Sequence, residues 1–386
     1  MNSLDHAPLA GVIVVSLEQA ISAPFCTRQL AELGATVIKV ERPGGDFARG
    51  YDSIVHGTAS YFMWANRGKQ SIVLDLKDDT DRATFDALIA GADIFIHNIA
   101  PDAAQRAHID AATLGAKHSG LIACEISGYG PGGPRSNDRA YDLAIQAEAG
   151  AFSVTGNDDV SKVGFSIADI SAGMYSLTSI LAALVRRDRT GEGAQIQVSM
   201  LDSVAEWMAG PMYGTVYSGS QPERTGRRHH GIAPYGTYTL SDGRVILIAV
   251  QNDREWERLA RNVLQSELLN DNFDFATAQA RIANVHALET EMNRVFAERD
   301  ADEIVRLLTE NDIAVARVND LHGVWNHEQL RTRDRFETIS IPDGQTAEVL
   351  KSPFDISNWV PNTSGVPNLD EHDDATINNI VERGQA

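Results

Sequence analysis

The sequence predicts an α/β protein with a large domain built on a parallel, doubly wound sheet and a smaller α+β domain. Over the first two hundred residues, short apolar runs alternate with segments of helical periodicity. The apolar runs are continuous, which is typical of strands buried on both faces of a parallel sheet. At 386 residues the chain is also longer than one core usually covers, so two domains are expected.

The predicted elements of the first region follow one another in βα order. Strands are predicted at 11–17, 36–41, 71–76, 93–98, 121–127 and 195–200, and helices at 22–35, 79–90, 102–116 and 200–209. We expect Ser22 to be the N-cap of the first helix and Gly34 to end it, because serine favours helix starts and glycine helix ends. A strand-like run over 165–168 stops at Asp169, and an apolar helix pattern follows over 170–184.

The composition changes after this region. Residues 210–234 are rich in Gly, Pro, Ser and Arg and are expected to connect two domains. Residues 235–250 have the pattern of a β-hairpin, the first sign of the α+β domain. Further helices are predicted at 252–264, 283–298 and 301–310, with a strand at 313–318 and a helix near the end of the chain.

Charge and cysteine content limit the possible partners and location. Asp and Glu total 53 against 33 Lys and Arg, a formal charge of −20. Such a field repels phosphate backbones and anionic lipid, so we expect no nucleic-acid or membrane partner. Cys26 and Cys124 form no CxxC spacing and are expected to be buried, reduced thiols. With no basic leader and no apolar run of membrane-spanning length, the expected location is cytoplasmic.

A dinucleotide site is not expected, although Glu41 ends the second strand of a βαβ pattern. The turn "SLEQAISAP" contains no glycine to approach a pyrophosphate. The later "GYGPGGP" (128–134) has glycines, but Pro131 and Pro134 prevent it from opening a helix in the required register. This segment is either an ordinary loop or a flexible cover beside a pocket, since open α/β sheets bind ligands at the carboxyl ends of their strands.

Two further features have a structural and a functional interpretation. The segment "RTGRRHHG" (224–231) is either a solvated basic loop or a site for a phosphate or carboxylate. Its adjacent histidines do not present one helix face to a metal, and no metal site is expected. Asp169 suits a helix N-cap, but a carboxylate held at the end of a strand is also a competent nucleophile toward an activated acyl group.

Several ordered motifs resemble the class III coenzyme A transferases, a family that includes formyl-CoA:oxalate, carnitine and mesaconyl-CoA transferases. They include "PLAGVIVVSLEQAISAPFCTRQLAELGATVIKVERPGGD", "NRGKQSIVLDL", "HNIAPDAAQR", "SGYGPGGP", "YDLAIQAEAGAFSVTG", "VGFSIADISAGMYS", "GEGAQIQVSMLDS" and the late "SPF". The resemblance implies that Asp169 attacks the thioester, giving an acyl–aspartyl anhydride and then an aspartyl–CoA thioester that the acceptor carboxylate attacks. Coenzyme A is then a substrate, and no separate cofactor is expected.

The resemblance also implies roles for other residues. Expected contacts to CoA are Gln19, Ala20, Arg42, Asn98, Ile99 and Arg106, and residues expected to support Asp169 are Arg139, Tyr141 and Asp142. The family often has lysine where Arg139 stands, which keeps the charge but changes the geometry. Related α-methylacyl-CoA racemases use the equivalent of Asp169 together with the histidine of a "GHD" triplet, which here is "AYD" (140–142). Tyrosine is a poor replacement for a histidine that titrates near neutrality, so racemisation is the alternative activity and ranks second.

Substrate class and assembly also follow from the resemblance. Formyl-CoA transferases place a glycine-rich lid where this chain has "TGRRHHGIAPYG", so Arg227, Arg228 and His229 are expected to bind the free carboxylate of a short dicarboxylate such as mesaconate, itaconate or succinate. Transfer between molecules or within one both remain open. A homodimer of interlocked chains is implied. Its large, Rossmann-like domain would comprise 1–209 and 331–386, its small domain 225–330, and its linker 210–224.

Overall fold

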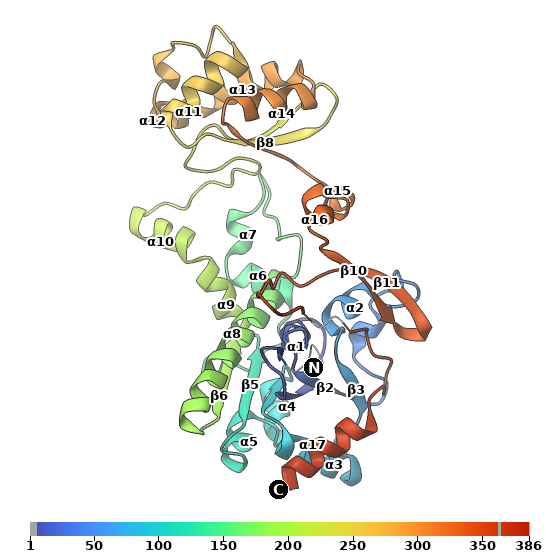
Figure 1. The fold of residues 1–386 in the computed structure, drawn as a ribbon. Coiled ribbons are helices and arrows are strands. Elements are labelled where there is room, and N and C mark those ends of the chain that lie inside the picture. The colour runs from blue at the N-terminus through green and yellow to red at the C-terminus, as the bar shows by residue number, and fades with distance from the viewer. Residues whose placement is uncertain (1–5, 362–363, 386) are drawn as a thin grey trace. The chain divides into compact units, whose positions relative to one another are not determined.

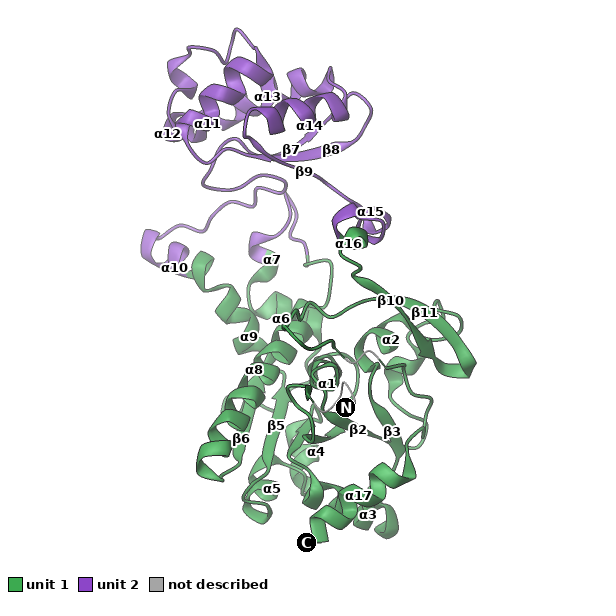
Figure 2. Cartoon of the chain, viewed as in Figure 1, with its two compact units in different colours: residues 1–152, 162–212, 330–386 green, residues 153–161, 213–329 purple. Residues whose placement is uncertain are grey.

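A computed structural model describes residues 6–361 and 364–385. The chain divides into two compact units (Figure 2). Unit 1 contains residues 1–152, 162–212 and 330–386, and unit 2 contains residues 153–161 and 213–329. The chain therefore enters unit 2 twice, briefly at 153–161 and then over 213–329, and returns to unit 1 for its last part.

Unit 1 is built on one six-stranded sheet (Figure 1). Its strands are β1 (Ile13–Leu17), β2 (Thr36–Glu41), β3 (Gln70–Val73), β4 (Ile94–His97), β5 (Ile122–Ser127) and β6 (Ala194–Ser199). Their order is β3-β2-β1-β4-β5-β6, and every pairing is parallel. The predicted parallel sheet is confirmed, and its strand order reverses between β1 and β4, where such sheets bind ligands.

Helices cover both faces of this sheet. The α-helices that lie wholly in unit 1 are α1 (Ser22–Glu32), α2 (Ser60–Asn66), α3 (Asp79–Gly91), α4 (Pro101–Arg106), α5 (Ala111–Lys117), α6 (Asp142–Glu148), α8 (Ile167–Thr190), α9 (Met200–Trp207) and α17 (Asp374–Gln385). Unit 1 also contains the hairpin of β10 (Phe336–Ile341) and β11 (Gln345–Leu350), which the sequence analysis did not anticipate. The predicted helix at 102–116 is two helices, α4 and α5, separated by a turn.

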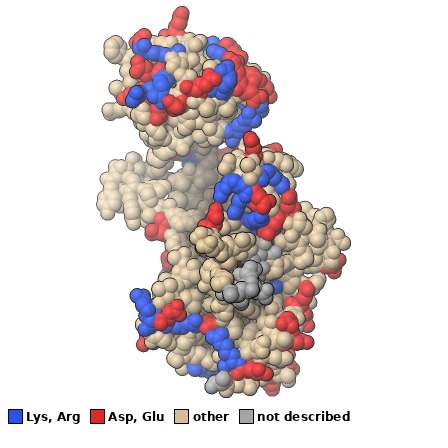
Figure 3. Space-filling model, in the orientation of Figure 1, with Lys and Arg blue, Asp and Glu red and all other residues tan. Residues whose placement is uncertain are grey.

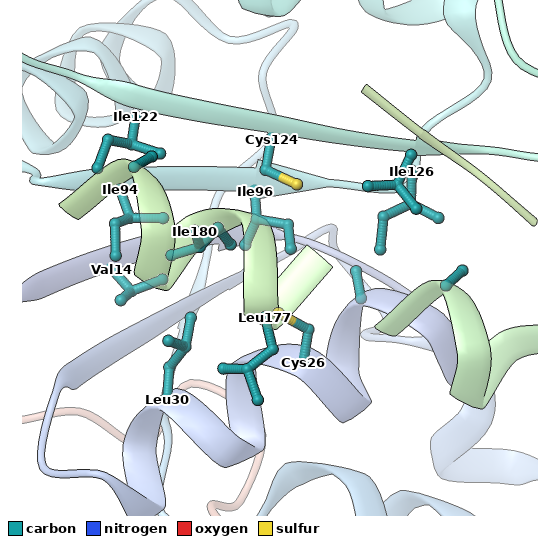
Figure 4. Packing of buried hydrophobic residues seen from close by; sticks show 14 of the residues in the cluster. Val14, Cys26, Leu30, Ile94, Ile96, Ile122, Cys124, Ile126, Leu177 and Ile180 are labelled. Carbon is teal, nitrogen blue, oxygen red and sulfur yellow. The ribbon is translucent and has the colours of Figure 1, made fainter. Parts of the chain in front are cut away.

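The two faces of the sheet carry separate apolar cores. On one face, strand residues such as Ile94 and Ile122 pack against Leu30 of α1 and Leu177 of α8 (Figure 4). On the other, their neighbours along the strands pack against side chains of α3, α5 and α17, including Phe85, Leu114 and Ile377. Cys26 and Cys124 are both buried in the first core as free thiols.

Helix α8 is the longest helix of unit 1. By length and composition alone it could cross a membrane, which the sequence analysis did not expect of any segment. Its apolar side chains, among them Leu177 and Ile180, instead face the sheet and α1. This is the packing of a central helix in a globular domain.

Unit 2 has its own sheet and core. Strands β7 (Tyr235–Thr239), β8 (Val245–Ala249) and β9 (Ala314–Arg317) are antiparallel in that order. Helical segments α11 (Asp253–Arg258), η3 (Leu259–Leu264), α12 (Ala278–Ala283), α13 (Val285–Ala297) and α14 (Ala301–Glu310) pack on it, and α15 (Leu321–Trp325) follows. On the face shown in Figure 3, acidic and basic side chains are interspersed over both units.

Three helices span the divisions between the units. They are α7 (Ala151–Val154), α10 (Ala209–Ser218) and α16 (Glu328–Thr332). The expected linker at 210–224 is therefore helical as far as Ser218. The sequence analysis treated the glycines of "AGPMYGTVYS" as loop formers, although apolar residues surround them. The stretch from 219 to 234, between α10 and β7, contains no helix or strand.

Candidate functional site

A cavity of about 660 Å³ lies in unit 1 at the carboxyl ends of β1, β4 and β5. This is the edge at which the reversal of strand order leaves a crevice. The sequence-predicted residues that line it are Gln19, Ala20, Asn98, Ile99, Arg139, Tyr141, Asp142 and Asp169. Four segments distant in the sequence thus meet around Asp169.

Asp169 is the third residue of α8 and not its N-cap. The N-cap is Ser166, and Ile167 and Ala168, predicted to be strand, form the first turn of the helix. The side chain of Ser166 makes no capping hydrogen bond. Instead Asp142, on α6, accepts the N–H groups of Ala168 and Asp169 at 2.7 and 3.3 Å. The cap comes from a residue distant in the sequence, so local sequence gave no signal of where the helix begins.

Gln146 fixes both Asp142 and the loop before α8. Its Nε2 donates to Asp142 Oδ2 at 2.7 Å and to the carbonyl of Phe165 at 3.2 Å, and its Oε1 accepts the N–H of Val163 at 2.9 Å. Gln146 itself is buried. Buried polar groups with all partners in place rigidify their surroundings, so the start of α8 is held in one position.

The Asp169 carboxylate is electrostatically disfavoured in its charged form. Burial, and then the neighbouring charge of Asp142, raise its pKa to about 7, while hydrogen bonds from the hydroxyl and backbone N–H of Ser22 oppose the rise. A carboxylate with this pKa is more basic than an ordinary aspartate and is still substantially ionised near neutrality. These are the properties of an acid–base or nucleophilic group in an enzyme site.

The turn after β1 is fixed by hydrogen bonds to the side chains of Asp46 and Asn98, which come from two other segments of the chain. Ala20 has a φ of 61°, in the left-handed region that non-glycine residues rarely adopt. Its N–H donates to Asp46 Oδ1 at 3.2 Å, and Asp46 Oδ2 pairs with the buried Lys39 at 2.8 Å. From the other side, the amide of Asn98 accepts the N–H of Gln19 at 3.0 Å and donates to its carbonyl at 2.7 Å.

An aromatic group completes the lining. Phe47, Tyr51 and Tyr61 face the cavity, and the rings of Phe47 and Tyr51 lie 5.7 Å apart. Partial burial, followed by the charges of Asp46 and Asp169, raises the pKa of Tyr51 to about 12. Tyr51 therefore keeps its proton at any physiological pH and offers an O–H donor in the cavity that holds Asp169.

Several predicted residues do not line this cavity. Arg42 is exposed and donates to the carbonyl of Gly45 at 3.2 Å, and Arg106 is exposed in the last turn of α4. The basic segment belongs to unit 2. There Arg228 lies 3.9 Å from Glu289 and His229 stacks on the ring of Tyr235, and Arg227 is exposed. The roles assigned to these residues stay predictions.

Other residues of the site were missed by sequence reasoning. Ser22 was considered only as a helix cap, yet it is the first residue of α1, lines the same cavity as Asp169 and lowers the pKa of that carboxyl. Gln146 gave no signal, since a glutamine in a helical pattern is common. Among the residues that the structure describes, no group of three or more His, Cys, Asp or Glu side chains could hold a metal ion.

Comparison with known proteins agrees with this geometry. The model of CoA-transferase family III matches residues 9–373. The chain is 31% identical to a succinyl-CoA:mesaconate CoA-transferase of Haloarcula hispanica, with 93% of each chain covered. It is 31% identical to a succinate–glutarate CoA-transferase of Agrobacterium fabrum, over 91% of this chain and 90% of that one. A crystal structure of a CAIB/BAIF family protein from Brucella suis superimposes with a TM-score of 0.87 at 32% identity, covering 97% of this chain and 99% of that chain. The chain therefore belongs to CoA-transferase family III and is a transferase enzyme.

Proposed function

We propose that the protein moves CoA from an acyl-CoA to a carboxylate through covalent intermediates on Asp169. The Asp169 carboxylate attacks the thioester carbonyl and releases CoA thiolate, giving an acyl–aspartyl anhydride. The thiolate then attacks the Asp169 carbonyl carbon, releases the donor acid and leaves an aspartyl–CoA thioester. The acceptor carboxylate reverses these two steps, so the activation energy of the thioester is conserved.

The observation that carries this proposal is the environment of Asp169. Its carboxylate lies in a cavity at the edge of the sheet, is fixed at the start of α8 and has a pKa raised to about 7. Partial exclusion of water strengthens the nucleophile and protects an anhydride from hydrolysis. An acid that only capped a helix would be expected to have a lowered pKa.

The test is to trap the intermediate and remove the nucleophile. Incubation with acyl-CoA followed by hydroxylamine or borohydride should modify one peptide, at Asp169, as read by mass spectrometry. Asp169→Ala should abolish transfer and labelling while leaving the melting temperature and CoA binding nearly unchanged. A variant that keeps a large share of the activity would refute the mechanism.

For the substrates we propose short dicarboxylates. The relatives named above act, by their names, on succinate, mesaconate and glutarate. A second carboxylate needs a cationic partner, and "RTGRRHHG" is the densest basic cluster in a chain with a formal charge of −20. We assign the free carboxylate to Arg227, Arg228 and His229. Racemisation, the alternative, is not favoured by these relatives.

Substrate comparison tests this assignment. Neutralising Arg227 removes a charge-assisted hydrogen bond, which contributes about 1.5–3 kcal/mol, or about ten- to a hundredfold in kcat/KM. The loss should appear with succinyl- or mesaconyl-CoA and be small with a monocarboxylic acyl-CoA of equal length. Arg261→Gln, which removes an exposed arginine paired with Asp271 in the same unit, is the matched control. Equal losses with both substrates would contradict the assignment.

The remaining roles are also proposals. Coenzyme A acts as substrate. Its path to Asp169 is lined by Gln19, Ala20, Asn98 and Ile99. Its phosphates bind Arg42 and Arg106. Arg139, Tyr141 and Asp142 support Asp169. The enzyme would work in the cytoplasm as a homodimer of interlocked chains. In support, α10 exposes Val216 and Tyr217, at 68% and 87%.

A further inference from the structure

We propose that Asp46 is a positioning residue for the transfer reaction: its carboxylate fixes two segments that line the Asp169 cavity, and the buried Lys39 fixes that carboxylate in turn. The inference rests on the proposed reaction at Asp169. It gives Asp46 no contact with the substrate. The effect of Asp46 on the rate passes through the backbone of the turn after β1, where Ala20 lies.

The first argument is that one oxygen of Asp46 binds both segments. Asp46 Oδ1 accepts the N–H of Ala20 at 3.2 Å and the N–H of Ala48 at 2.9 Å. Ala20 belongs to the turn after β1, and Ala48 belongs to the short helix η2 (Phe47–Gly50), which Asp46 caps. The turn and η2 both contribute residues to the lining of the cavity. A displacement of this oxygen would therefore move both segments.

The second argument is the backbone conformation of Ala20. Its φ of 61° lies in the left-handed region, which a residue with a Cβ rarely adopts. Such conformations persist where the surroundings impose them, and they are concentrated at active sites. Here Asp46 accepts the N–H of Ala20, while Asn98 binds both the N–H and the carbonyl of Gln19. The conformation of the turn is thus imposed from two sides.

The third argument is how Asp46 itself is held. Lys39 Nζ lies 2.8 Å from Asp46 Oδ2, and both side chains are buried. Lys39 Nζ also lies 3.6 Å from Glu18 Oε1, to which Lys69 Nζ approaches at 2.7 Å. Burial alone would lower the pKa of Lys39, but the charges of Glu18 and Asp46 outweigh it and raise the pKa above its usual value. Lys39 is therefore a cation that keeps the carboxylate of Asp46 in one orientation.

The fourth argument is energetic. Taking two ions out of water is costly, and a buried ion pair is often no more stabilising than apolar residues of the same volume. Stability alone therefore does not explain the ion pair of Lys39 with Asp46 next to this turn. Fully bonded buried polar groups do fix geometry, which an apolar contact does less well. Geometry matters here because a displacement of about 1 Å can lower the rate of an enzyme about a hundredfold.

Two double variants isolate the acceptor oxygen. Lys39→Met/Asp46→Asn and Lys39→Met/Asp46→Leu both remove the two charges together, so neither leaves an unpaired buried ion, and Glu18 keeps Lys69. Only the first retains a side-chain oxygen for the N–H of Ala20. We expect kcat of the second variant to be lower than that of the first by up to about a hundredfold, with a smaller change in KM.

Rescue by glycine separates positioning from stability. Glycine adopts a φ near 61° without steric cost, and Asn98 still holds Gln19 from the other side. In the Ala20→Gly background, kcat of the two double variants should therefore become nearly equal. The reference for these rates is Ala20→Gly alone, because Ala20 itself lines the cavity.

Arg67→Met is the matched control. It removes a buried cation of unit 1 that pairs with Glu32 at 2.6 Å and does not line the cavity, and it leaves Arg28 beside Glu32. This variant should lower the melting temperature and keep kcat, in the presence and absence of Ala20→Gly. A rescue of both kinds of variant by Ala20→Gly would mean that the glycine acts on stability, and the positioning role would fall.

Asp46→Glu gives the comparison in a chain that keeps its charges. The longer side chain can still pair with Lys39, but its oxygens are displaced by one methylene from the N–H of Ala20. We expect a lower kcat that Ala20→Gly largely restores. A wild-type kcat in Asp46→Glu would overturn the proposal, also where Lys39→Met/Asp46→Leu does not fold.

Trapping distinguishes failure of this inference from failure of the proposed function. With acyl-CoA and hydroxylamine, Lys39→Met/Asp46→Leu should still be modified at Asp169, more slowly than Lys39→Met/Asp46→Asn. Equal rates of labelling and equal kcat in the two variants would refute the role of Asp46 and leave Asp169 as nucleophile. Absence of any Asp169 adduct in the wild type would instead refute the proposed function.

Discussion

The carboxylates of Asp142 and Asp169 both lie at the start of α8, where their charges repel each other while hydrogen bonds hold Asp142 in place. The carboxylate oxygens of Asp142 accept hydrogen bonds from two N–H groups at the start of α8 and from Gln146, and the negative charge of Asp142 remains beside Asp169. The arrangement holds the nucleophile in place and makes it more basic at the same time. A stronger base is a better nucleophile only while it stays ionised, so the benefit depends on pH.

At this scale we predict the effect of removing the neighbouring charge. The reactive form of Asp169 is the carboxylate, so kcat/KM of the wild type should rise with pH and reach half its limit near pH 7. In Asp142→Asn the like charge is gone while an oxygen remains for the N–H of Ala168, so the acid limb should move to lower pH. Rates across pH 5–9 measure it. Asp188→Asn, at the exposed far end of α8, is the control; an unmoved limb in Asp142→Asn would show that the repulsion is unimportant.

Between elements, the contact of α1 with α8 sets the position of the site. Gly173 of α8 lies against the start of α1, where a Cβ would come within 2.8 Å of the Ser22 carbonyl oxygen and 3.0 Å of the Phe25 ring. The two helices can approach this closely only because residue 173 has no side chain. The approach also sets where the start of α1 lies relative to Asp169, which is one turn earlier on α8.

We predict that Gly173→Ala separates the helices. Overpacking of this kind costs about 1–3 kcal/mol, and the melting temperature should fall accordingly. Transfer activity should fall further than stability explains, because the start of α1, which lines the cavity, is moved away from Asp169. Gly214→Ala in α10, where a Cβ meets nothing within 4 Å, should leave activity intact. Full activity in Gly173→Ala would show that the close approach is not required.

Strands and helices were predictable from the sequence where the residues that determine them lie within the segment itself. The continuous apolar runs of β1, β2, β4 and β5 gave the parallel sheet, and the alternating pattern after 235 gave the hairpin of unit 2. The start of α8 was not predictable, because its cap is Asp142. The hairpin of β10 and β11 was missed for a similar reason: its inward side chains, Ile339 and Val349, pack in a core with Phe62 of α2.

The same distinction applies to the site. Asp169 was identified through the resemblance to a family, and no local pattern would have separated it from other acids near helix starts. Ser22 was assigned to a helix cap because serine commonly is one. Its place in the same cavity as Asp169 depends on how α1 and α8 pack, which no short stretch of sequence encodes.

At the scale of the whole molecule, the proposed interlocking of two chains would have a kinetic consequence that can be measured. Chains that pass through one another cannot separate without unfolding, whereas chains that only touch exchange by dissociation. We predict a dimeric mass by light scattering and no mixed species after tagged and untagged dimers are incubated together for a day. Refolding the mixture from denaturant should yield mixed dimers. Mixing without denaturant would contradict interlocking, and a monomeric mass would contradict the dimer.

The return of the chain to unit 1 also bears on how the protein is made. The six strands are complete by β6, but α17, whose Ile377 and Ile380 cover Phe85 and Leu88 of α3, follows only after unit 2. A nascent chain on the ribosome therefore carries an uncovered apolar helix for as long as unit 2 is being synthesised. Exposed apolar surface of this kind recruits chaperones and favours aggregation. Premature termination before α17 should accordingly be harmful to solubility even though every residue around Asp169 has already been translated.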